Sequence, residues 1–341
     1  MKVALDAMGA EKGIGTVIDA SFAALKENPD IQIILIGKSE EIQKEIKKRS
    51  IKKIPFSIFP APEVVSMDDS ALAPLKEKRN SSISVGIELV KKGEADAFVS
   101  AGNTGAVMAT SLIKLGKLEG VVRPCLAATF PTIDGKKVVI TDVGANVDCK
   151  PVHLFQFALL GNIYAHKVLK IKNPKVALLN IGSEENKGNE VVVEAFKILK
   201  KSPLNFIGNI EGKDVTSGKA EVVVCDGFVG NILLKFAEEF AATTISLLDK
   251  EIKKNSSGVG HFVAGDLFRK IRETLDYAEY GGVPLLGVNG VCVVAHGASC
   301  SKAIKNAIIT SYNFHKLGIN KLIENALKEI KKRQENEKQK S

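Results

Sequence analysis

Glycine and polar side chains occur together in short loops that directly follow apolar runs. The first such loop, Ser100–Gly105, reads Ser-Ala-Gly-Asn-Thr-Gly and precedes an apolar-periodic stretch that begins at Ala106. Glycine lets the backbone approach an oxyanion closely, and the free amides at the start of a helix attract negative charge. The loop therefore predicts either an anion site or a tight strand-to-helix turn. It is not the phosphate loop of nucleotide hydrolases, because no Gly-Lys-Ser/Thr follows.

Three further loops carry charged groups, at residues 142–150, 180–190 and 225–231. Two aspartates, Asp142 and Asp148, lie in the first of these, but hard cations need more oxygen ligands than the segment offers, so metal binding is the weaker interpretation. In the next loop, the Lys187 ammonium could pair with phosphate or with a developing oxyanion. Asp226 could orient or deprotonate a reacting group, or simply cap a helix.

The fifth loop region, residues 280–290, is dense in glycine and is followed by an apolar run and then His296. This histidine suits acid–base chemistry and a hydrogen-bonded structural role about equally. The Cys225 thiol invites an acyl-enzyme interpretation, which ranks low because no base stands at a recognisable spacing. The cysteines are odd in number and widely spaced, which predicts reduced thiols: Cys125, Cys149, Cys225, Cys292 and Cys300.

Runs rich in valine and isoleucine alternate with longer amphipathic stretches. They lie at residues 3–5, 31–36, 56–59, 97–99, 138–140, 176–179, 222–224 and 291–294. The runs lack period-two alternation, which is typical of strands buried on both faces, so we predict an α/β fold with a largely parallel sheet covered by helices. Parallel strands direct their carboxyl ends to one edge, where we expect the glycine loops to form one ligand site.

The chain is expected to form one α/β catalytic unit over residues 1–320, followed by a C-terminal helix and charged tail over 321–341. A long helix over 228–253 and a second helix over about 261–277 predict a helix pair protruding at 240–280. One face of the second helix is apolar, with Val263, Leu267, Phe268, Ile271 and Leu275 on one arc. The pattern alone favours packing of this face against the core or a second subunit over contact with a membrane surface.

The net charge of +9 comes mainly from two runs. Residues 38–53 contain seven Lys/Arg and three Glu, and residues 316–341 contain eight and four. Without tryptophan, zinc-type spacing or a recognition module, nucleic-acid binding is not expected. The basic runs suit an acidic protein partner or anionic lipid, but a solvated surface is the favoured interpretation of either run taken alone. The chain starts directly with a predicted strand and has no apolar run of about 18 residues, which predicts neither secretion nor a membrane span.

These segments together resemble one family. They are 4–9, 96–106, 142–150, 187–190, 205–212, 225–231 and 280–290. In this order they resemble the bacterial acyl-acyl-carrier-protein:phosphate acyltransferase family (PlsX) of phospholipid synthesis, over the chain to about residue 310. One departure stands out, because Met8-Gly9 continues as Ala10-Glu11 where the family commonly has Gly-Asp.

The resemblance implies transfer of a fatty acyl group from acyl carrier protein to inorganic phosphate, giving acyl phosphate for a downstream glycerol-3-phosphate acyltransferase. It implies a three-layer α/β/α fold like that of phosphate acetyltransferases and isocitrate-type dehydrogenases, assembled as a homodimer. The residues themselves show no nucleotide or metal motif, so no cofactor or metal is expected. It also implies a cytoplasmic protein held peripherally at the inner face of the membrane. For the second helix, contact with a membrane surface is then expected in place of packing against the core or a second subunit. The expected membrane contacts are Val263, Leu267, Phe268 and Ile271.

Carried onto this sequence, the resemblance makes Lys187 and Asp226 the catalytic residues. Phosphate, held by the Ser100–Gly105 loop and Lys187, would attack the thioester directly, with Asp226 orienting it or accepting a proton. The residues expected to bind substrate or phosphate are Asp6, Gly9, Ser100, Gly102, Asn103, Thr104, Gly105, Asp142, Asn146, Asn189, Gly227, Asn231, Asn289 and His296.

Two other functions are compatible with the sequence. A phosphate acetyl- or butyryltransferase that uses acyl-coenzyme A would share the fold and the acyl phosphate chemistry. A non-catalytic membrane scaffold would keep the amphipathic helix without phosphate-dependent cleavage of a thioester. A dehydrogenase is disfavoured, because the stretch from Gly9 to Gly15 does not match the dinucleotide fingerprint.

Overall fold

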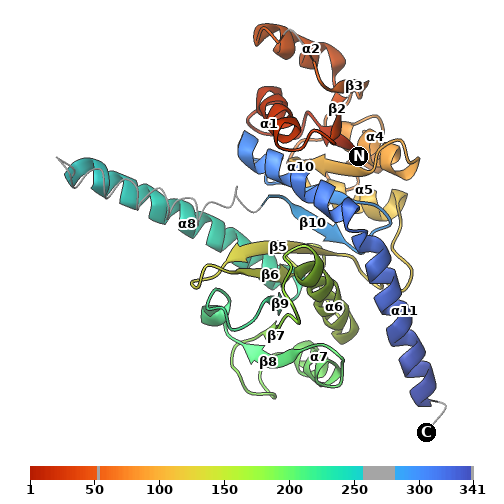
Figure 1. Cartoon of the computed structure of the whole chain (residues 1–341), viewed down its shortest axis with the longest axis vertical. Coiled ribbons are helices and arrows are strands. Elements are labelled where there is room, and N and C mark those ends of the chain that lie inside the picture. The colour runs from red at the N-terminus through yellow and green to blue at the C-terminus, as the bar shows by residue number, and fades with distance from the viewer. Residues whose placement is uncertain (52–53, 256–280, 339–341) are drawn as a thin grey trace.

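The computed structural model describes residues 1–51, 54–255 and 281–338. Within them, one 11-stranded sheet has the order β3-β2-β1-β4-β11-β10-β5-β6-β9-β7-β8, with helices packed on both faces (Figure 1). Most neighbouring strands are parallel, including β1 with β2 and β4, and β9 with β6 and β7. This arrangement confirms the predicted three-layer α/β fold with a mostly parallel sheet.

Each of the predicted apolar runs forms a strand. The strands are β1 Lys2–Asp6, β2 Gln32–Gly37, β3 Ser57–Pro60, β4 Ala97–Ser100, β5 Cys125–Pro131, β6 Lys137–Thr141, β7 Val176–Leu179, β8 Phe206–Ile210, β9 Val222–Val224, β10 Val283–Leu286 and β11 Cys292–Val294. Three of these, β5, β8 and β10, were not predicted. Alanine, glycine and proline interrupt their sequences, so tertiary pairing rather than local propensity makes them strands.

Helices cover both faces of the sheet. They are α1 Ile14–Glu27, α2 Ser39–Lys48, α3 Ala73–Lys76, α4 Ser82–Lys91, α5 Thr104–Lys114, α6 Pro151–Lys167, α7 Glu190–Lys200, α8 Gly227–Asn255, α10 Ser301–Lys316 and α11 Ile319–Lys338. In β1, Val3 and Leu5 pack with α1 and α10, whereas Ala4 packs with α4. In β6, Val139 packs with α6 and Ile140 packs with α8. Burial on both faces is the reason that these strands lack period-two alternation.

The sheet reverses direction at its centre. Strand β10 is antiparallel to both β11 and β5, and β5 is antiparallel to β6. Strands β1 to β4 and β11 therefore run one way, while β6 to β9 run the other way. Our expectation that all the glycine loops share one edge is wrong, because a run of valines identifies a buried strand without revealing its direction.

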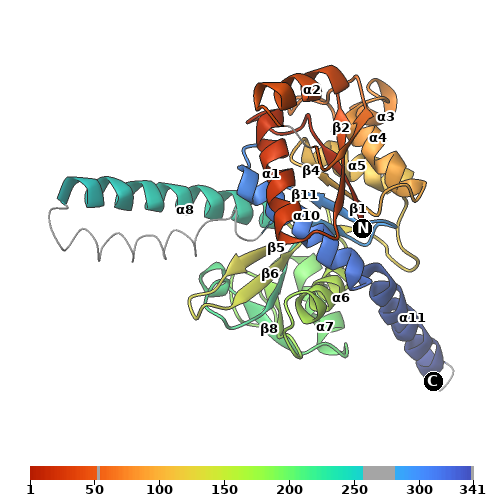
Figure 2. The same ribbon diagram turned by 45° about the horizontal axis from the view of Figure 1, so that its top comes forward.

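Helix α8 projects from the middle of the molecule well beyond the sheet (Figures 1 and 2). It confirms the long helix predicted over 228–253. The predicted second helix over about 261–277, with its four expected membrane contacts, lies outside the described residues. No helix that the structure describes is long and apolar enough to span a membrane.

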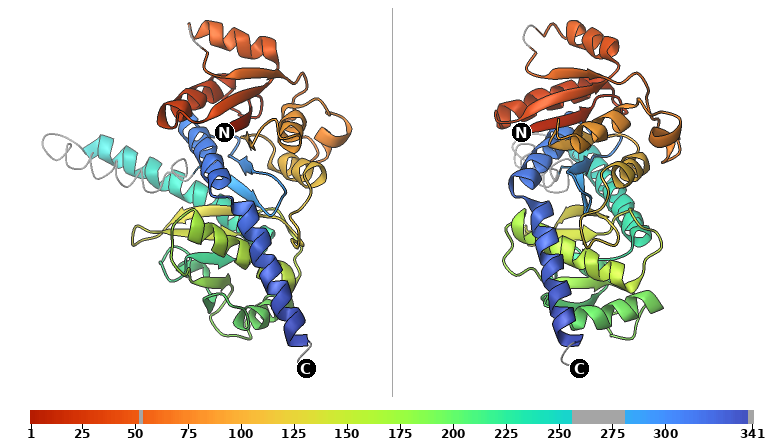
Figure 3. Two further views of the ribbon diagram at one scale, coloured as in Figure 1. Left: turned by 45° about the vertical axis from the view of Figure 1, so that its right-hand side comes forward. Right: turned by 90° about the vertical axis from the view of Figure 1, so that its right-hand side faces the viewer.

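Helices α10 and α11 follow one another across both halves of the molecule (Figure 3). The first packs against α1, and the second packs against α6. Helix α11 continues to Lys338, so most of the charged stretch expected to be a tail is helical. Lysine, glutamate and glutamine have high helix propensity, which accounts for this extension.

Candidate functional site

A buried carboxylate organises the edge of the sheet where β1 and β4 end. The Asp6 Oδ1 atom accepts hydrogen bonds from the backbone N–H groups of Met8 at 2.9 Å and Gly9 at 3.2 Å. Its Oδ2 atom accepts one from the Ser100 hydroxyl at 2.7 Å, and that hydroxyl accepts the Gly102 N–H at 2.9 Å. We name Asp6, Gly9, Ser100 and Gly102 the Asp6 cluster.

The Asp6 carboxylate positions loops, because both of its oxygens are occupied and only 1% of the residue is exposed. Burial raises its pKa, while hydrogen bonds from Ser82, Ser100 and the backbone act in the opposite direction. The loops pack backbone against backbone here. A Cβ atom on Gly9 would lie 2.5 Å from Asp6 Oδ2 and 2.7 Å from the backbone of Gly102, so glycine is required.

Helix α5 begins directly beside this cluster. The Asn103 side chain caps it, since Oδ1 accepts the Ala106 N–H at 2.9 Å. The Asn103 Nδ2 atom lies 3.0 Å from the carbonyl oxygen of Asp69 and also contacts those of Ser66 and Met67. Thr104 is exposed at the first turn. The positive end of the α5 dipole therefore lies at a solvent-accessible edge, as an anion site requires.

The loop that follows β11 joins the same edge. The Ala295 N–H donates to the Ser100 carbonyl oxygen at 2.8 Å, and the Glu11 N–H donates to the Gly297 carbonyl oxygen at 3.0 Å. His296 is exposed, and its Nδ1 atom accepts the Ala298 N–H at 3.1 Å. The structure thus brings His296 next to the Asp6 cluster. Glu11, which differs from the residue common in the family, contacts the loop that carries His296.

A second buried carboxylate organises the opposite edge, where β6 and β9 end. Asp142 Oδ1 accepts the N–H groups of Leu126 at 2.9 Å and Ala145 at 3.1 Å. Its Oδ2 atom accepts the Asn146 backbone N–H at 2.7 Å and the Asn146 side-chain amide at 2.9 Å. That amide also donates to the Pro124 carbonyl oxygen at 2.7 Å. Burial raises the pKa of Asp142, and these hydrogen bonds oppose the rise.

The start of α8 packs against this carboxylate. The Gly227 N–H donates to the Asn146 carbonyl oxygen at 2.7 Å, and Asp226 Oδ1 caps the helix by accepting the Val229 N–H at 2.9 Å. Asn231 lies beside Gly144, where a Cβ atom would be 3.4 Å from Asn231 Oδ1. We name Asp142, Asn146, Asp226, Gly227 and Asn231 the Asp142 cluster. Asn289 lies on the loop between β10 and β11, and its N–H donates to the Gly116 carbonyl oxygen at 3.0 Å.

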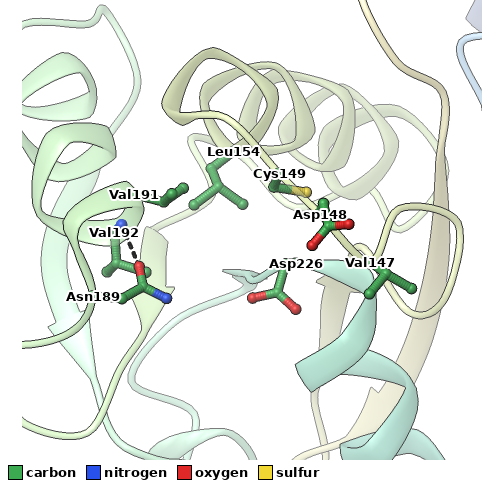
Figure 4. A pocket seen from close by; sticks show the side chains of 8 residues that line it. All are labelled: Val147, Asp148, Cys149, Leu154, Asn189, Val191, Val192 and Asp226. Atoms are coloured by element: carbon green, nitrogen blue, oxygen red, sulfur yellow. Dashed lines mark hydrogen bonds between the residues drawn. The ribbon is translucent and has the colours of Figure 1, made fainter.

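A small cavity of about 180 Å³ adjoins the Asp142 cluster (Figure 4). It is lined by Val147, Asp148, Cys149, Leu154, Asn189, Val191, Val192 and Asp226. Asn189 caps α7 through the Val192 N–H at 3.0 Å and lies across the cavity from Asp226 (Figure 4). Among these lining residues are two carboxylates and no basic side chain. An anion bound here would need a cation from elsewhere.

Lys187 lies in the exposed loop that leads to Asn189, but it does not line the cavity. Its aliphatic chain runs beside Gly182, where a Cβ atom would be 3.2 Å from Lys187 Cγ. The Lys187 carbonyl oxygen accepts the Asn180 amide at 2.8 Å, which fixes the loop backbone. Lys187 is thus close in sequence to the cavity, while the Asp6 cluster lies at the other edge of the sheet.

The thiols near this cavity are poor nucleophiles. Burial, with a contribution from nearby Asp142 and Asp226, raises the pKa of Cys149 to about 12. Burial raises the pKa of Cys225 well above its ordinary value. Both thiols stay protonated at neutral pH, so the geometry gives no support to an acyl-cysteine intermediate. Within the described ranges, no group of three His, Cys, Asp or Glu side chains could hold a metal ion.

Two buried polar residues beside these loops were not predicted. The Ser82 hydroxyl hydrogen-bonds Asp6 from the start of α4. Ser299 is 1% exposed beneath the His296 loop. No spacing rule identifies Ser82, because its position depends on how α4 packs on the sheet. For Ser299, the available signal was the glycine-containing turn directly after the apolar run of β11.

Replacing Asp142 with asparagine is expected to lower the free energy of unfolding by about 2 kcal/mol or more, because an amide N–H would face backbone N–H donors. Because the pKa of Asp142 is raised in the folded state, the Asp142 carboxylate binds a proton more readily in the native protein than in the unfolded chain. The deficit of the variant should therefore widen as pH falls through the raised pKa toward 3.8. Urea unfolding at several pH values measures this. Unchanged stability with lost turnover would instead make Asp142 a substrate contact.

Comparison with known proteins identifies the chain's relatives. Residues 1–322 match the family model described as "Fatty acid synthesis protein". A phosphate acyltransferase of Heliobacterium modesticaldum is 47% identical over 310 residues, covering 90% of this chain and 92% of the relative. A phosphate acyltransferase of Dictyoglomus turgidum is 45% identical over 335 residues, covering 97% and 98%.

Solved structures give the same fold. A phosphotransacetylase from Streptococcus pyogenes aligns with a TM-score of 0.62 at 19% identity, over 93% of this chain and 94% of that one. A branched-chain phosphotransacylase from Enterococcus faecalis aligns with a TM-score of 0.56 at 16% identity, over 92% and 98%. These likenesses concern the fold alone. The family match and the close relatives carry the identification, and the chain therefore belongs to the phosphate acyltransferase family and is an acyltransferase.

Proposed function

We propose that this protein transfers a fatty acyl group from acyl carrier protein to inorganic phosphate and so makes acyl phosphate. The observation that carries the proposal is the 45% identity to a phosphate acyltransferase over 97% of the chain. A phosphate oxygen attacks the thioester carbonyl carbon, a carbon–oxygen bond forms, and the carbon–sulfur bond breaks. The carrier thiol leaves with the proton given up by phosphate. A glycerol-3-phosphate acyltransferase would then consume the product.

In this reaction the Ser100–Gly105 loop and the start of α5 bind phosphate through backbone N–H groups. Lys187 pairs with phosphate and stabilises the oxyanion of the tetrahedral intermediate, and Asp226 orients phosphate or accepts its proton. One oxygen of Asp226 caps α8, which leaves the other free to face the cavity. Direct attack by phosphate fits the protonated state of Cys149 and Cys225.

The Asp6 cluster and the Asp142 cluster lie at opposite edges of the sheet in one chain. We therefore propose that the two clusters come together between the subunits of a homodimer. Helix α8 supports this assignment, because it carries an exposed apolar strip, which we name the α8 strip. It consists of Val229, Ile232, Phe236, Phe240 and Leu247, each between 41% and 65% exposed. Their spacing places them on one side of the helix. A second copy that covers the strip would supply its own Lys187 and Asp226 to the Asp6 cluster of the first.

A carrier protein as acyl donor fits the exposed lysines in the C-terminal half of α2. This helix begins directly after β2, a neighbour of β1, so its acidic first turn lies at the edge of the Asp6 cluster and its lysines follow toward its C-terminal end. Lys44, Lys47 and Lys48 are exposed on it, whereas Arg49 is paired with Asp19 and Glu45. Acyl carrier proteins are acidic, so we expect this face to attract the donor by charge complementarity.

Changing Lys44, Lys47 and Lys48 together to glutamate is expected to raise KM for the carrier-bound donor about tenfold at low salt, with kcat unchanged. The matched control is Lys331→Glu with Lys332→Glu on α11, where both lysines are exposed. Steady-state kinetics at two salt concentrations measures both variants. An increase in KM for the α11 variant alone would move the docking surface to that helix.

The function is tested by release of carrier thiol from purified long-chain acyl carrier protein, with and without phosphate. Hydroxylamine traps the acyl phosphate, and acyl-coenzyme A is run in parallel. Phosphate-dependent release with trapped product supports the proposal. Preference for acyl-coenzyme A would favour a phosphate acetyl- or butyryltransferase, and no release from either donor would favour a non-catalytic membrane scaffold.

Peripheral attachment to the inner face of the membrane completes the proposal, with Val263, Leu267, Phe268 and Ile271 as contacts. The support is the apolar arc that these residues form at helical spacing. Sedimentation with anionic lipid vesicles tests it. Binding that survives Leu267→Asp combined with Phe268→Asp would contradict the assignment of these contacts.

A further inference from the structure

A large cavity lies beneath α8, separate from the small one at Asp226. Its volume is about 840 Å³, within the range of sites that hold small organic ligands. The walls are mainly apolar, with Ala128 and Phe130 of β5, Ile140 of β6, and Leu234 and Ala241 of α8. Phosphate is small and charged, so it does not match a large cavity with mainly apolar walls.

The end of the cavity that lies at the edge of the sheet with the Asp6 cluster contains polar side chains, and we name it the polar end. Ala295, His296 and Ser299 line this end. The Ala295 N–H donates to the carbonyl oxygen of Ser100, so the polar end adjoins the Asp6 cluster directly. From there the apolar walls extend beneath α8 toward Thr216. An amphipathic ligand with a polar head beside Ser100 and a long apolar tail matches this arrangement.

Ser299 gives independent evidence for a ligand. The residue is 1% exposed, and its hydroxyl oxygen has no hydrogen-bond partner among the residues that the structure describes. A buried hydroxyl without a partner destabilises the folded protein. Because Ser299 lines the polar end of the cavity, a carbonyl oxygen bound there would accept its hydrogen.

We propose that this cavity holds the fatty acyl chain during transfer, with the acyl carbonyl at the Ser299 end. The Ser299 hydroxyl donates a hydrogen bond to the carbonyl oxygen, and the chain lies between α8 and strands β5 and β6. The inference rests on the proposed function, because it assigns the acyl part of that substrate. It places the reacting carbon beside the phosphate-binding loop and makes acyl length a property of the α8 cavity.

The test compares two tryptophan variants of one helix. Ala241 lines the cavity, whereas Ala242 is exposed on the side of α8 that carries Lys235 and Glu239. Ala241→Trp is expected to weaken binding of the fluorescent C18 fatty acid cis-parinaric acid at least tenfold, and Ala242→Trp should leave it unchanged. Equal affinity in the two variants, or no binding to the wild type, would overturn the proposal.

Kinetics separates this proposal from the function on which it rests. Ala241→Trp should lose at least tenfold in kcat/KM with a C16 donor and retain turnover with a C4 donor. An equal effect on both donors would overturn the cavity assignment and leave acyl transfer intact. If the wild type transferred neither acyl group, the proposed function would fail, and the binding comparison would still decide what the cavity holds.

Ser299→Ala covers the case in which the tryptophan variant does not fold. Loss of one hydrogen bond to the carbonyl should lower kcat/KM about three- to tenfold. The Tm of the free protein should not fall, because the hydroxyl has no partner among the described residues to lose. A lower Tm with unchanged kinetics would make Ser299 a structural residue and overturn its role at the carbonyl.

Discussion

Lys187→Ala should lower phosphate-dependent turnover about 10²- to 10³-fold, the usual effect of removing one preorganised donor to an oxyanion. The protein should stay folded, because Lys187 is exposed and the loop is fixed through its backbone. Release of carrier thiol under saturating donor measures the effect. Lys200→Ala is the matched control, since it removes an exposed ammonium paired with Glu185 of the same loop.

Asp226 requires a variant that separates its two roles. Asp226→Ala would remove both the carboxylate and the cap of α8, which alone costs about 1 kcal/mol. Asp226→Ser keeps an oxygen that accepts the Val229 N–H while removing the free carboxylate oxygen. A turnover loss of about 10²-fold with unchanged Tm is expected for the serine variant. Near-normal turnover in this variant or in Lys187→Ala would defeat the catalytic assignment.

The second large effect is recovery of activity in a mixed dimer. Thr104→Glu places a negative charge at the exposed start of α5 and should prevent phosphate binding, and Asp226→Ser inactivates the other cluster. Each variant alone should be nearly inactive. A heterodimer with one chain of each type, isolated with two affinity tags, should recover about half of wild-type turnover, because one of its two shared sites is intact.

The reciprocal heterodimer makes this result decisive. It pairs a wild-type chain with a chain that carries both Thr104→Glu and Asp226→Ser. If sites are shared between subunits, each site contains one altered cluster and the dimer should be nearly inactive. If each chain holds a whole site, this dimer keeps about half of wild-type turnover and the first one is inactive. The two preparations therefore give opposite results under the two arrangements.

The sequence predicted the layers of the fold better than the directions of its strands. Valine-rich runs such as 222–224 are buried on both faces, and this burial is directly visible as the absence of alternation. Strands β5 and β10 have weaker apolar patterns, and they are the ones that reverse the sheet. Strand direction depends on pairing between distant segments, and no local periodicity encodes such pairing.

For the candidate site, the sequence identified individual loops but not their grouping. The helix cap offered as the alternative role of Asp226 formed, because a cap depends on neighbouring residues only. The cap at Asn103 was not predicted. The separation of Lys187 from Ser100 follows from the central reversal, which the sequence did not reveal. The buried roles of Asp6 and Asp142 likewise depend on packing, since most of their donors are backbone groups of folded loops.

The position of β11 between β4 and β10 has a consequence for synthesis of the protein on the ribosome. Strand β4 pairs with β1 on one side and with β11 on the other, and β11 is made only after the whole second half of the sheet. Until then, the nascent N-terminal half has an open strand edge and lacks α10, which covers α1. Open edges and uncovered apolar faces promote association between chains. Chaperone capture of nascent chains should therefore persist until β11 and α10 have emerged.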